Sequence, residues 1–275
     1  MLGFNSYRRS HFAPAFFLLP ASKRKALQVL YEVCRQIDDA VDESNESPDA
    51  VLNAWDKFFR DHDAQVLGPF GLERLANEFL SVVTSFGLPW NVMADLIHKG
   101  VGVDLNKSRF QTPMDTESYC YGVAGTVGIA CLPIFGVPVE EGRAYATRLG
   151  IAIQWVNLIR DVGEDAAMGR IYLPIEHLER FNYSESDLLS KKKLPAFDSL
   201  MRFEAEVARS HFKRAHELFP LKWEKELKPA RVMGTIYAAL LLKLERSRFP
   251  VFDRQIRLNM FEKAAATIKA VTRRN

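Results

Sequence analysis

The chain has 275 residues, of which 48% are hydrophobic and 26% charged, proportions that are typical of a globular protein and exclude an intrinsically disordered one. Its formal net charge of +3 is the small difference between 37 basic and 34 acidic residues, so charge gives no reason to expect nucleic acid as a partner. No break in composition divides the sequence, and a single domain spanning residues 1–275 is predicted.

Near the N-terminus, Arg8 and Arg9 precede the apolar run of residues 12–20, an order that imitates a short export signal. Pro14 and Pro20 interrupt this run, which leads directly into the first strong helical pattern, so we interpret it as part of the folded protein. No stretch of the sequence approaches the roughly 18 uncharged apolar residues of a membrane span. The expected location is the cytoplasm, with any membrane contact peripheral to the membrane surface.

The first predicted helix runs from about residue 22 to residue 42, where apolar residues recur at intervals of three and four as on one face of an amphipathic helix. Ser47 is a suitable cap for a second helix, because Pro48 follows it at the first helical position. Alternating strand patterns are scarce, and the predicted fold class is therefore all-α. Further helices are predicted at residues 71–86, 90–99, 115–134, 139–166, 195–218, 222–247 and 260–273.

The three cysteines, Cys34, Cys120 and Cys131, are odd in number and lack the spacing of metal ligands. A disulfide framework and a zinc site are therefore not expected. Free cysteines in the core indicate a reducing compartment, in agreement with a cytoplasmic location.

The first predicted helix ends in "CRQIDDAVDE", residues 34–43, in which Asp38 and Asp42 stand one helical turn apart. At this spacing the two side chains differ by about 40° around the helix axis and about 6 Å along it, so both carboxylates can point at one site. Like charges so placed destabilise a helix by a few tenths of a kcal/mol unless something neutralises them. On its own, such a pair is most often part of a solvated helix surface.

A second acidic stretch, "QWVNLIRDVGEDAAMGRIYLP", places Asn157, Asp161 and Asp165 at successive four-residue steps of a helix that is otherwise largely apolar. Two acidic clusters on two apolar helices predict a shared cation site. Because every donor is a hard oxygen, the expected metal is Mg²⁺. Magnesium is usually held by one or two carboxylates together with substrate phosphates, so the sequence also predicts a diphosphate between the clusters.

Several basic residues could balance the charge of a diphosphate, although each could equally be an ion-pair partner. Three lie beside the acidic residues and two lie late in the chain: Arg35, Arg160, Arg170, Arg254 and Arg257. The late basic clusters are open to a further interpretation, because they could meet anionic lipid or form a solvated helix face.

Glycines at 122, 125 and 128 recur every three residues in the apolar stretch "ESYCYGVAGTVGIACLP", despite a helical cost of about 1 kcal/mol for each glycine. Close packing between helices and room for a bulky ligand both explain this pattern. The shorter stretch "GVGVDL", residues 100–105, lacks the third glycine and the preceding strand of a dinucleotide-binding fingerprint.

These stretches resemble the squalene/phytoene synthase family over residues 12–257. The resemblance rests on "LYEVCRQIDDAVDE", "YCYGVAGTVG", "QWVNLIRDVGEDAAMGRIYLP" and "YAALLLKLERSRFPVFDRQIR", which occur in the family's order and at similar distances. It implies an all-α isoprenoid synthase fold with a central cavity and two acidic motifs on opposing helices. The resemblance assigns metal binding to Asp38, Asp42, Asn157, Asp161 and Asp165, and it assigns catalysis to these four aspartates together with Tyr31 and Tyr119.

The resemblance also implies roles for residues outside the acidic motifs. Positions that match the family's cavity and substrate-binding residues are Tyr31, Arg35, Tyr119, Gln154, Asn157, Tyr237 and Arg254, and Phe12, Phe16 and Phe17 would line the cavity. The N-terminal segment departs from the family, since His11 and Pro14 stand where many relatives have a serine-rich segment with a tyrosine. No diphosphate contact is therefore assigned to that segment.

The family joins two allylic prenyl diphosphates head to head. By this resemblance, Mg²⁺ bridges the carboxylates to a diphosphate, the allylic C–O bond ionises, and the double bond of the second substrate attacks the cation to give a cyclopropyl diphosphate. We expect two farnesyl diphosphates as substrates, with presqualene diphosphate or a squalene-type product of hopanoid-type biosynthesis. NADPH is not expected to be needed for this first half-reaction.

Two alternatives stay open at this point. A phytoene synthase would use two geranylgeranyl diphosphates, and the motifs do not separate it from a farnesyl-using enzyme because side chains set the length of the cavity. A non-catalytic assembly or scaffold protein of the family is disfavoured by the four intact aspartates. The sequence leaves the oligomeric state undetermined.

Overall fold

The structure is a computed structural model that describes residues 19–42, 47–105 and 108–272. These residues are mostly helical and contain no β-strand, only an isolated β-bridge between Arg109 and Ile171. The all-α class predicted from the sequence is therefore confirmed. The first half of the chain contains α3 (Ala21–Asp42), α4 (Pro48–Asp61), η1 (Ala64–Phe70), α5 (Glu73–Phe86), α6 (Trp90–Asp95), η2 (Leu96–Gly100), η3 (Val101–Leu105), α7 (Pro113–Cys120), η4 (Tyr121–Gly125) and α8 (Thr126–Phe135).

The second half of the chain is built around two long helices, α9 and α12, which pack against each other. Its elements are α9 (Val139–Ala167), α10 (Ile175–Arg180), α11 (Glu185–Leu189), α12 (Pro195–Glu217), η5 (Leu221–Trp223), α13 (Lys228–Arg246) and α14 (Met260–Thr272).

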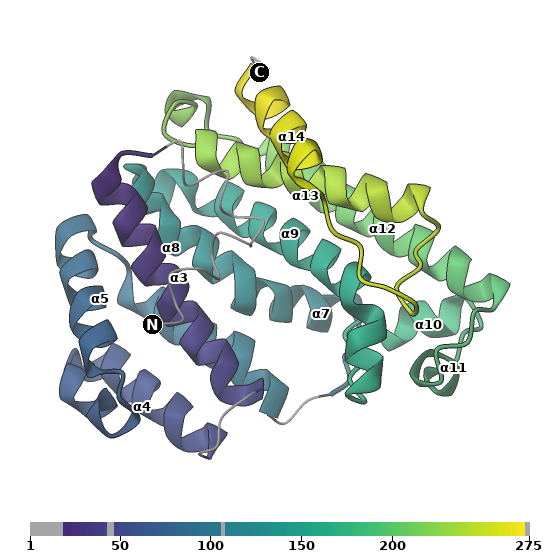
Figure 1. Ribbon diagram of the computed structural model, residues 1–275, viewed down its shortest axis with the longest axis horizontal. Coiled ribbons are helices and arrows are strands. Elements are labelled where there is room, and N and C mark those ends of the chain that lie inside the picture. Colours follow the sequence, from purple (N-terminus) through teal and green to yellow (C-terminus); the bar gives the residue numbers. More distant parts are fainter. Residues whose placement is uncertain (1–18, 43–46, 106–107, 273–275) are drawn as a thin grey trace.

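Helix α9 is the central helix of the fold, and α8, α12 and α13 pack around it (Figure 1). Its buried residues lie on more than one face, as expected for a helix that is apolar all round. Two glycines permit its closest contacts: a Cβ at Gly150 would lie 2.6 Å from the carbonyl oxygen of Ala124, and one at Gly163 would lie 2.1 Å from that of Val251. A side chain at either position would push α9 away from its neighbours.

A buried carboxylate also holds α9 in place. Nε1 of Trp155 on α9 donates a hydrogen bond to Glu204 of α12 over 2.9 Å, and Nδ1 of His177 on α10 lies 2.8 Å from the other carboxylate oxygen. Glu204 is fully buried, so these partners supply the polar contacts that it needs away from water. The network fixes α9 between α10 and α12.

Helices α7 and α8 form one helical run, interrupted by the π-helical turn η4. A second π-helical turn, η2, lies against η4, and a Cβ at Gly122 would lie 2.1 Å from the carbonyl oxygen of Lys99. Close packing therefore explains Gly122. Among the described residues, Pro113–Phe135 is the one segment long and apolar enough to cross a membrane, but 56% of its apolar window is buried inside the protein.

The predicted helix boundaries differ from the observed ones at a few points. Helix α7 begins two residues earlier than predicted because Thr112 and Asp115 form a capping box. The helix predicted from residue 222 begins at Lys228, since Leu221–Trp223 form a separate 3₁₀ turn. The short helices η1, α10 and α11 are absent from the prediction because so few residues cannot show a helical period.

Candidate active site

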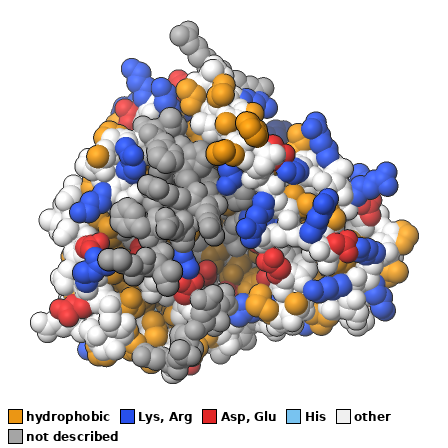
Figure 2. Space-filling model, in the orientation of Figure 1, with side chains coloured by type: hydrophobic (Ala, Val, Ile, Leu, Met, Phe, Trp, Pro, Cys, Tyr) orange, Lys and Arg blue, Asp and Glu red, His pale blue; other side chains and the backbone are white. Residues whose placement is uncertain are grey.

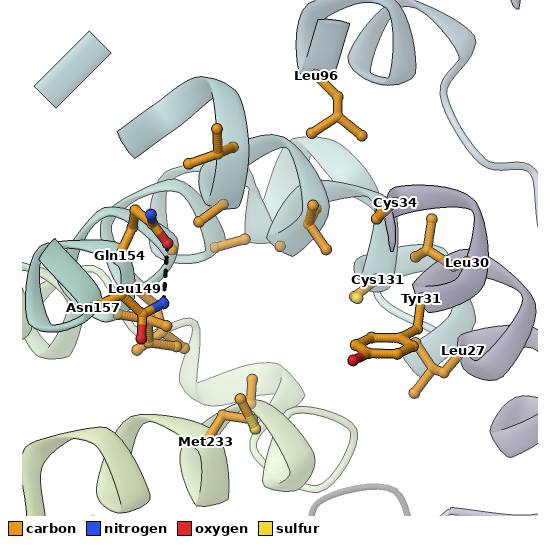
Figure 3. A pocket seen from close by; sticks show the side chains of 18 of the residues that line it. Leu27, Leu30, Tyr31, Cys34, Leu96, Cys131, Leu149, Gln154, Asn157 and Met233 are labelled. Carbon is orange, nitrogen blue, oxygen red and sulfur yellow. Dashed lines mark hydrogen bonds between the residues drawn. The ribbon is translucent and has the colours of Figure 1, made fainter. Parts of the chain in front are cut away.

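A cavity of about 430 Å³ lies between α3, α8, α9 and the beginning of α13. Figure 3 shows Tyr31 of α3 facing Gln154 and Asn157 of α9 across this cavity, with Met233 of α13 on a third side. The π-helical turn η2 contributes Leu96, and turns of this kind recur at functional sites. The volume falls in the range of small-molecule sites, about 300–1,000 Å³.

The wall of the cavity changes from apolar to polar along both of its long helices. On α3 the lining residues run from Leu27 to Asp38, and on α9 they run from Tyr145 to Asp161. Because α3 and α9 run in the same general direction (Figure 1), their polar residues meet at one end of the cavity. The result is an apolar body with a charged end.

Helix α3 brings Tyr31, Arg35 and Asp38 to the cavity. Asp38 is exposed at the charged end. Nε of Arg35 donates a hydrogen bond to Asp39 over 3.0 Å, and this bond raises the pKa of Arg35 above its ordinary value. Asp39, which was not among the residues predicted for the site, thus orients the guanidinium of Arg35. The side chain of Asp42 lies outside the described residues.

Helix α9 brings Arg160 and Asp161 to the same end. Arg160 donates two hydrogen bonds to Asp161, of 2.7 and 2.5 Å, in a bidentate pair. Nε2 of Gln255 donates to Asp161 over 3.0 Å, and Arg257 donates to Oε1 of Gln255 over 2.5 Å. Gln255 was not among the residues predicted for the site, although it lies in the closing motif between Arg254 and Arg257.

The side-chain oxygen of Asn157 accepts no hydrogen bond from any described residue and is available as a ligand for a cation. Its Nδ2 donates to Oε1 of Gln154 over 3.0 Å (Figure 3), while its Oδ1 is buried and accepts no hydrogen bond from the described part of the chain. Tyr237 of α13 is buried beside Asn157 and does not belong to the cavity wall. Burial raises the pKa of Tyr237, which the neighbouring Arg160 and Asn157 partly lower.

Asp165 lies one turn beyond Asp161 and is not among the residues that line the main cavity; it lines a separate small pocket that it shares with Arg170. Burial, and then the charge of Asp161, raise the pKa of Asp165 to about 8, against the opposing effect of Arg170. The Asp165 carboxyl therefore carries a proton near neutral pH when no cation is bound. Two carboxylates this close need a positive charge between them to ionise together.

These oxygen donors fit a hard cation such as Mg²⁺. Asn157, Asp161 and Asp165 approach from α9 and Asp38 from α3, and the unused Oδ1 of Asn157 is a donor that a cation would satisfy. In the described residues no three acidic, histidine or cysteine side chains lie close enough together to hold a metal ion by themselves. A cation placed here would find part of its coordination shell on each of the two helices.

Tyr119 lines the cavity and is held by a residue that the sequence analysis did not single out. Its hydroxyl donates to Oδ2 of Asp104 over 2.9 Å, and the hydroxyl of Tyr172 donates to Oδ1 over 2.8 Å. The two tyrosine rings are stacked, with centroids 4.9 Å apart. Asp104 lies within "GVGVDL", which had been set aside as a failed dinucleotide motif, and no sequence signal connects it with Tyr119.

Two other predicted substrate-binding residues, Arg170 and Arg254, are not among the residues that line the cavity. Arg254 is exposed and is not among the lining residues, although the adjacent Gln255 contacts Asp161. Arg170 accompanies Asp165 in the neighbouring pocket. Phe12 and Phe16 lie outside the described residues.

The sequence profile of the squalene/phytoene synthase family matches residues 7–262. The chain belongs to this family. The resemblance noted in the motifs is therefore confirmed, and the family is one of head-to-head condensing prenyltransferases. The acidic helices α3 and α9 are the two on which the family's acidic motifs were expected.

Named relatives include phytoene synthases and a diapophytoene synthase. The chain is 33% identical to a 15-cis-phytoene synthase of Synechocystis over 267 residues, which cover 90% of this chain and 77% of the relative. It is 29% identical to a 4,4'-diapophytoene synthase of Staphylococcus haemolyticus over 246 residues, which cover 88% of this chain and 85% of that one.

Solved structures give the same fold. A dehydrosqualene synthase in complex with a ligand matches with a TM-score of 0.84 and 25% identity, covering 98% of this chain and 94% of its own. A squalene synthase of Alicyclobacillus acidocaldarius matches with a TM-score of 0.76 and 23% identity, covering 89% of this chain and 90% of its own. The isoprenoid synthase fold expected from the motifs is confirmed.

Proposed function

We propose that the protein condenses two farnesyl diphosphates head to head in the presence of Mg²⁺, giving presqualene diphosphate or a squalene-type product. The observation that carries this proposal is the polarity of the cavity. Carboxylates and arginines of α3 and α9 gather at one end, and apolar side chains surround the rest. A prenyl diphosphate has the same division between a charged head and a hydrocarbon tail.

At the charged end, Arg35 and Arg160 would bind diphosphate oxygens, and Asp38, Asn157, Asp161 and Asp165, together with Asp42, would hold the metal. A bound Mg²⁺ would neutralise the negative charge that develops on the departing diphosphate. Arg160 is well suited to this end because it is already oriented by its bidentate contact with Asp161.

The apolar body binds the prenyl chains and keeps water away from the reacting carbons. Burying hydrocarbon is worth about 0.8 kcal/mol for each methylene, so the wall needs few polar contacts to hold its substrates. Excluding water matters because an allylic cation would otherwise be hydrolysed. Tyr119 stands in this wall with its hydroxyl directed by Asp104. Burial and the charge of Asp104 raise the pKa of Tyr119, which keeps its phenol protonated.

Two aromatic side chains support the fifteen-carbon substrate over the twenty-carbon one. The cavity is lined beside the α8–α9 turn by Phe135, at the end of α8, and Tyr145, near the start of α9. Along α9, Tyr145 lies at the opposite end of the cavity lining from the charged residue Asp161. Bulky rings at that point limit the length of the prenyl tail. A diapophytoene synthase and a dehydrosqualene synthase among the similar proteins support the same assignment.

The second candidate is the condensation of two geranylgeranyl diphosphates to phytoene. It is favoured by the names of three relatives with identities of 31–33%, all of which are phytoene synthases. Competition between farnesyl and geranylgeranyl diphosphates, with purified protein, Mg²⁺ and product analysis, tests both candidates. Preferred formation of thirty-carbon product supports the first, preferred formation of phytoene replaces it with the second, and no product from either substrate refutes both.

A further inference from the structure

Helix α14 displays its large apolar side chains to solvent. It packs on α13 through small residues, Ala266 and Ala270, which are buried. Phe261 is 82% exposed and Ile268 63% exposed, and Val271 is also exposed. Since residues 261, 264, 268 and 271 share one face of a helix, the outward side of α14 is apolar along its length. We call Met260, Phe261, Ile268 and Val271 the α14 face.

Hydrogen bonds attach helix α14 firmly to the rest of the protein. Asn259 and Glu262 cap the helix through reciprocal hydrogen bonds of 2.9 and 2.7 Å. Glu262 also accepts a hydrogen bond of 2.7 Å from Lys243 of α13, which in turn donates to the carbonyl oxygen of Arg257. These contacts hold α14 on α13 with its apolar side chains pointing outward.

In Figure 2, hydrophobic side chains gather at the top of the molecule, over α14, with Lys and Arg side chains nearby. Leu242 on the adjacent α13 is exposed as well. Residues 254–272 contain four basic residues, Arg254, Arg257, Lys263 and Lys269, and a single acidic one, Glu262, which Lys243 already pairs. The apolar face thus lies in a region of net positive charge.

We propose that the α14 face docks on an anionic lipid bilayer. Its apolar side chains enter the boundary between headgroups and acyl chains, and Lys269 and the exposed arginines contact lipid phosphates. Charge decides between the possible partners: a second copy of this chain would bring like charges together, whereas an anionic bilayer complements both the basic and the apolar residues. An exposed cluster of this kind on one helix marks an interaction surface.

This inference stands on residues outside the cavity and does not depend on which prenyl diphosphate is used.

Flotation of the full-length protein with lipid vesicles tests the proposal directly. The vesicles are phosphatidylcholine alone and phosphatidylcholine mixed with phosphatidylglycerol. The wild-type protein should bind the mixed vesicles, and added salt should weaken that binding. The Phe261→Ser/Ile268→Ser double variant should bind about tenfold more weakly or worse, because it loses its two largest anchors. Lys269→Gln should weaken binding and reduce its salt dependence.

Met114→Ser is the matched control, because Met114 is 79% exposed on α7 and is not part of the α14 face. It should bind within about twofold of wild type. Circular dichroism and thermal unfolding verify that each variant is folded. Turnover in detergent solution should be unchanged in the double variant. This control distinguishes a failure of docking from a failure of the proposed function.

Absence of wild-type binding to the mixed vesicles, or equal binding by the double variant, overturns the proposal. A dimer in solution that the double variant loses, without vesicle binding by wild type, also overturns it in favour of contact between copies of this chain.

Discussion

The hydroxyl of Tyr119 donates a hydrogen bond to Oδ2 of Asp104 over 2.9 Å and so joins the cavity wall to η3. Asp104 accepts a second hydrogen bond from Tyr172 with its other oxygen. A carboxylate that accepts hydrogen bonds from two phenols fixes the direction of both hydroxyl groups. Of the two tyrosines, Tyr119 lines the cavity and Tyr172 does not. Asp104 is therefore expected to act on the reaction through Tyr119.

Asp104→Asn should lower kcat about tenfold to a hundredfold, the range for residues that orient a catalytic group, with little change in KM. Tyr119→Phe should have a similar effect, and the double variant should be no worse than Tyr119→Phe alone, because both changes remove one interaction. Steady-state kinetics on the three variants measure this. Effects that multiply in the double variant would show that Asp104 acts independently of Tyr119.

Asp38→Asn and Asp161→Asn should each lower turnover by orders of magnitude while the melting temperature stays close to that of wild type. Both carboxylates lie at the charged end of the cavity, where the proposed function needs a negatively charged oxygen rather than an amide. Asp198→Asn is the control, since Asp198 is an exposed partner of Arg202 on α12. Near-normal activity in both site variants, or full activity with excess chelator, would contradict the metal assignment.

The buried carboxyl of Asp165, with a pKa of about 8, gives a pH test that needs no substrate. Its pKa is raised above the unfolded value, so its contribution to folding stability is fully present at low pH and is lost as the pH rises through about 8. Each pH unit between the ordinary aspartate pKa of about 4 and the folded value of about 8 removes up to about 1.4 kcal/mol, or roughly 2–4 °C of melting temperature for a chain of this size, and the loss levels off above pH 8.

Thermal unfolding at pH 7 and pH 9, without and with Mg²⁺, measures this effect. Wild type should lose more stability than Asp165→Asn between the two pH values when Mg²⁺ is absent, and added Mg²⁺ should restore part of the loss. Identical pH profiles for the two proteins would place the pKa of Asp165 in its ordinary range.

The two acidic helices could be predicted from the sequence because their signals are local. Periodicity identified the helices, and four-residue spacing placed Asp161 and Asp165 on one face. The contacts of Asp104 and Gln255 could not be predicted, since Tyr119 is 15 residues from Asp104 and Asp161 is 94 residues from Gln255. Only the packing of several helices brings such partners together, and an aspartate or a glutamine in the sequence does not by itself indicate such a contact.

Phe135→Ala should raise the use of geranylgeranyl diphosphate relative to farnesyl diphosphate. Phe135 is buried at the α8–α9 turn and lines the cavity, so its removal makes room for a longer prenyl tail. Competition assays with both substrates measure the ratio of products, and Phe181→Ala, at a partly buried ring outside the cavity lining, controls for loss of stability. An unchanged ratio would mean that residues other than Phe135 set the chain length.

The first half-reaction should proceed without NADPH, because forming a cyclopropyl diphosphate from two prenyl diphosphates involves no reduction. Assays with farnesyl diphosphate and Mg²⁺, with and without NADPH, should give presqualene diphosphate or a product formed from it without reduction in both cases. A product that forms only when NADPH is present, and that is squalene, would refute this prediction and leave head-to-head condensation in place.

The π-helical turn η4 makes the length of the chain itself a determinant of the cavity. A π turn contains one residue more than an α turn, so α7 and α8 are two segments of helix held out of phase with each other. Deleting one residue between Tyr121 and Gly125 would let an ordinary α-helix form and rotate α8 by about 100° relative to α7. Gly128 would then leave the wall that contains Tyr119, even though no lining residue had been replaced. Insertions and deletions at this turn should therefore be more harmful than most single substitutions in it.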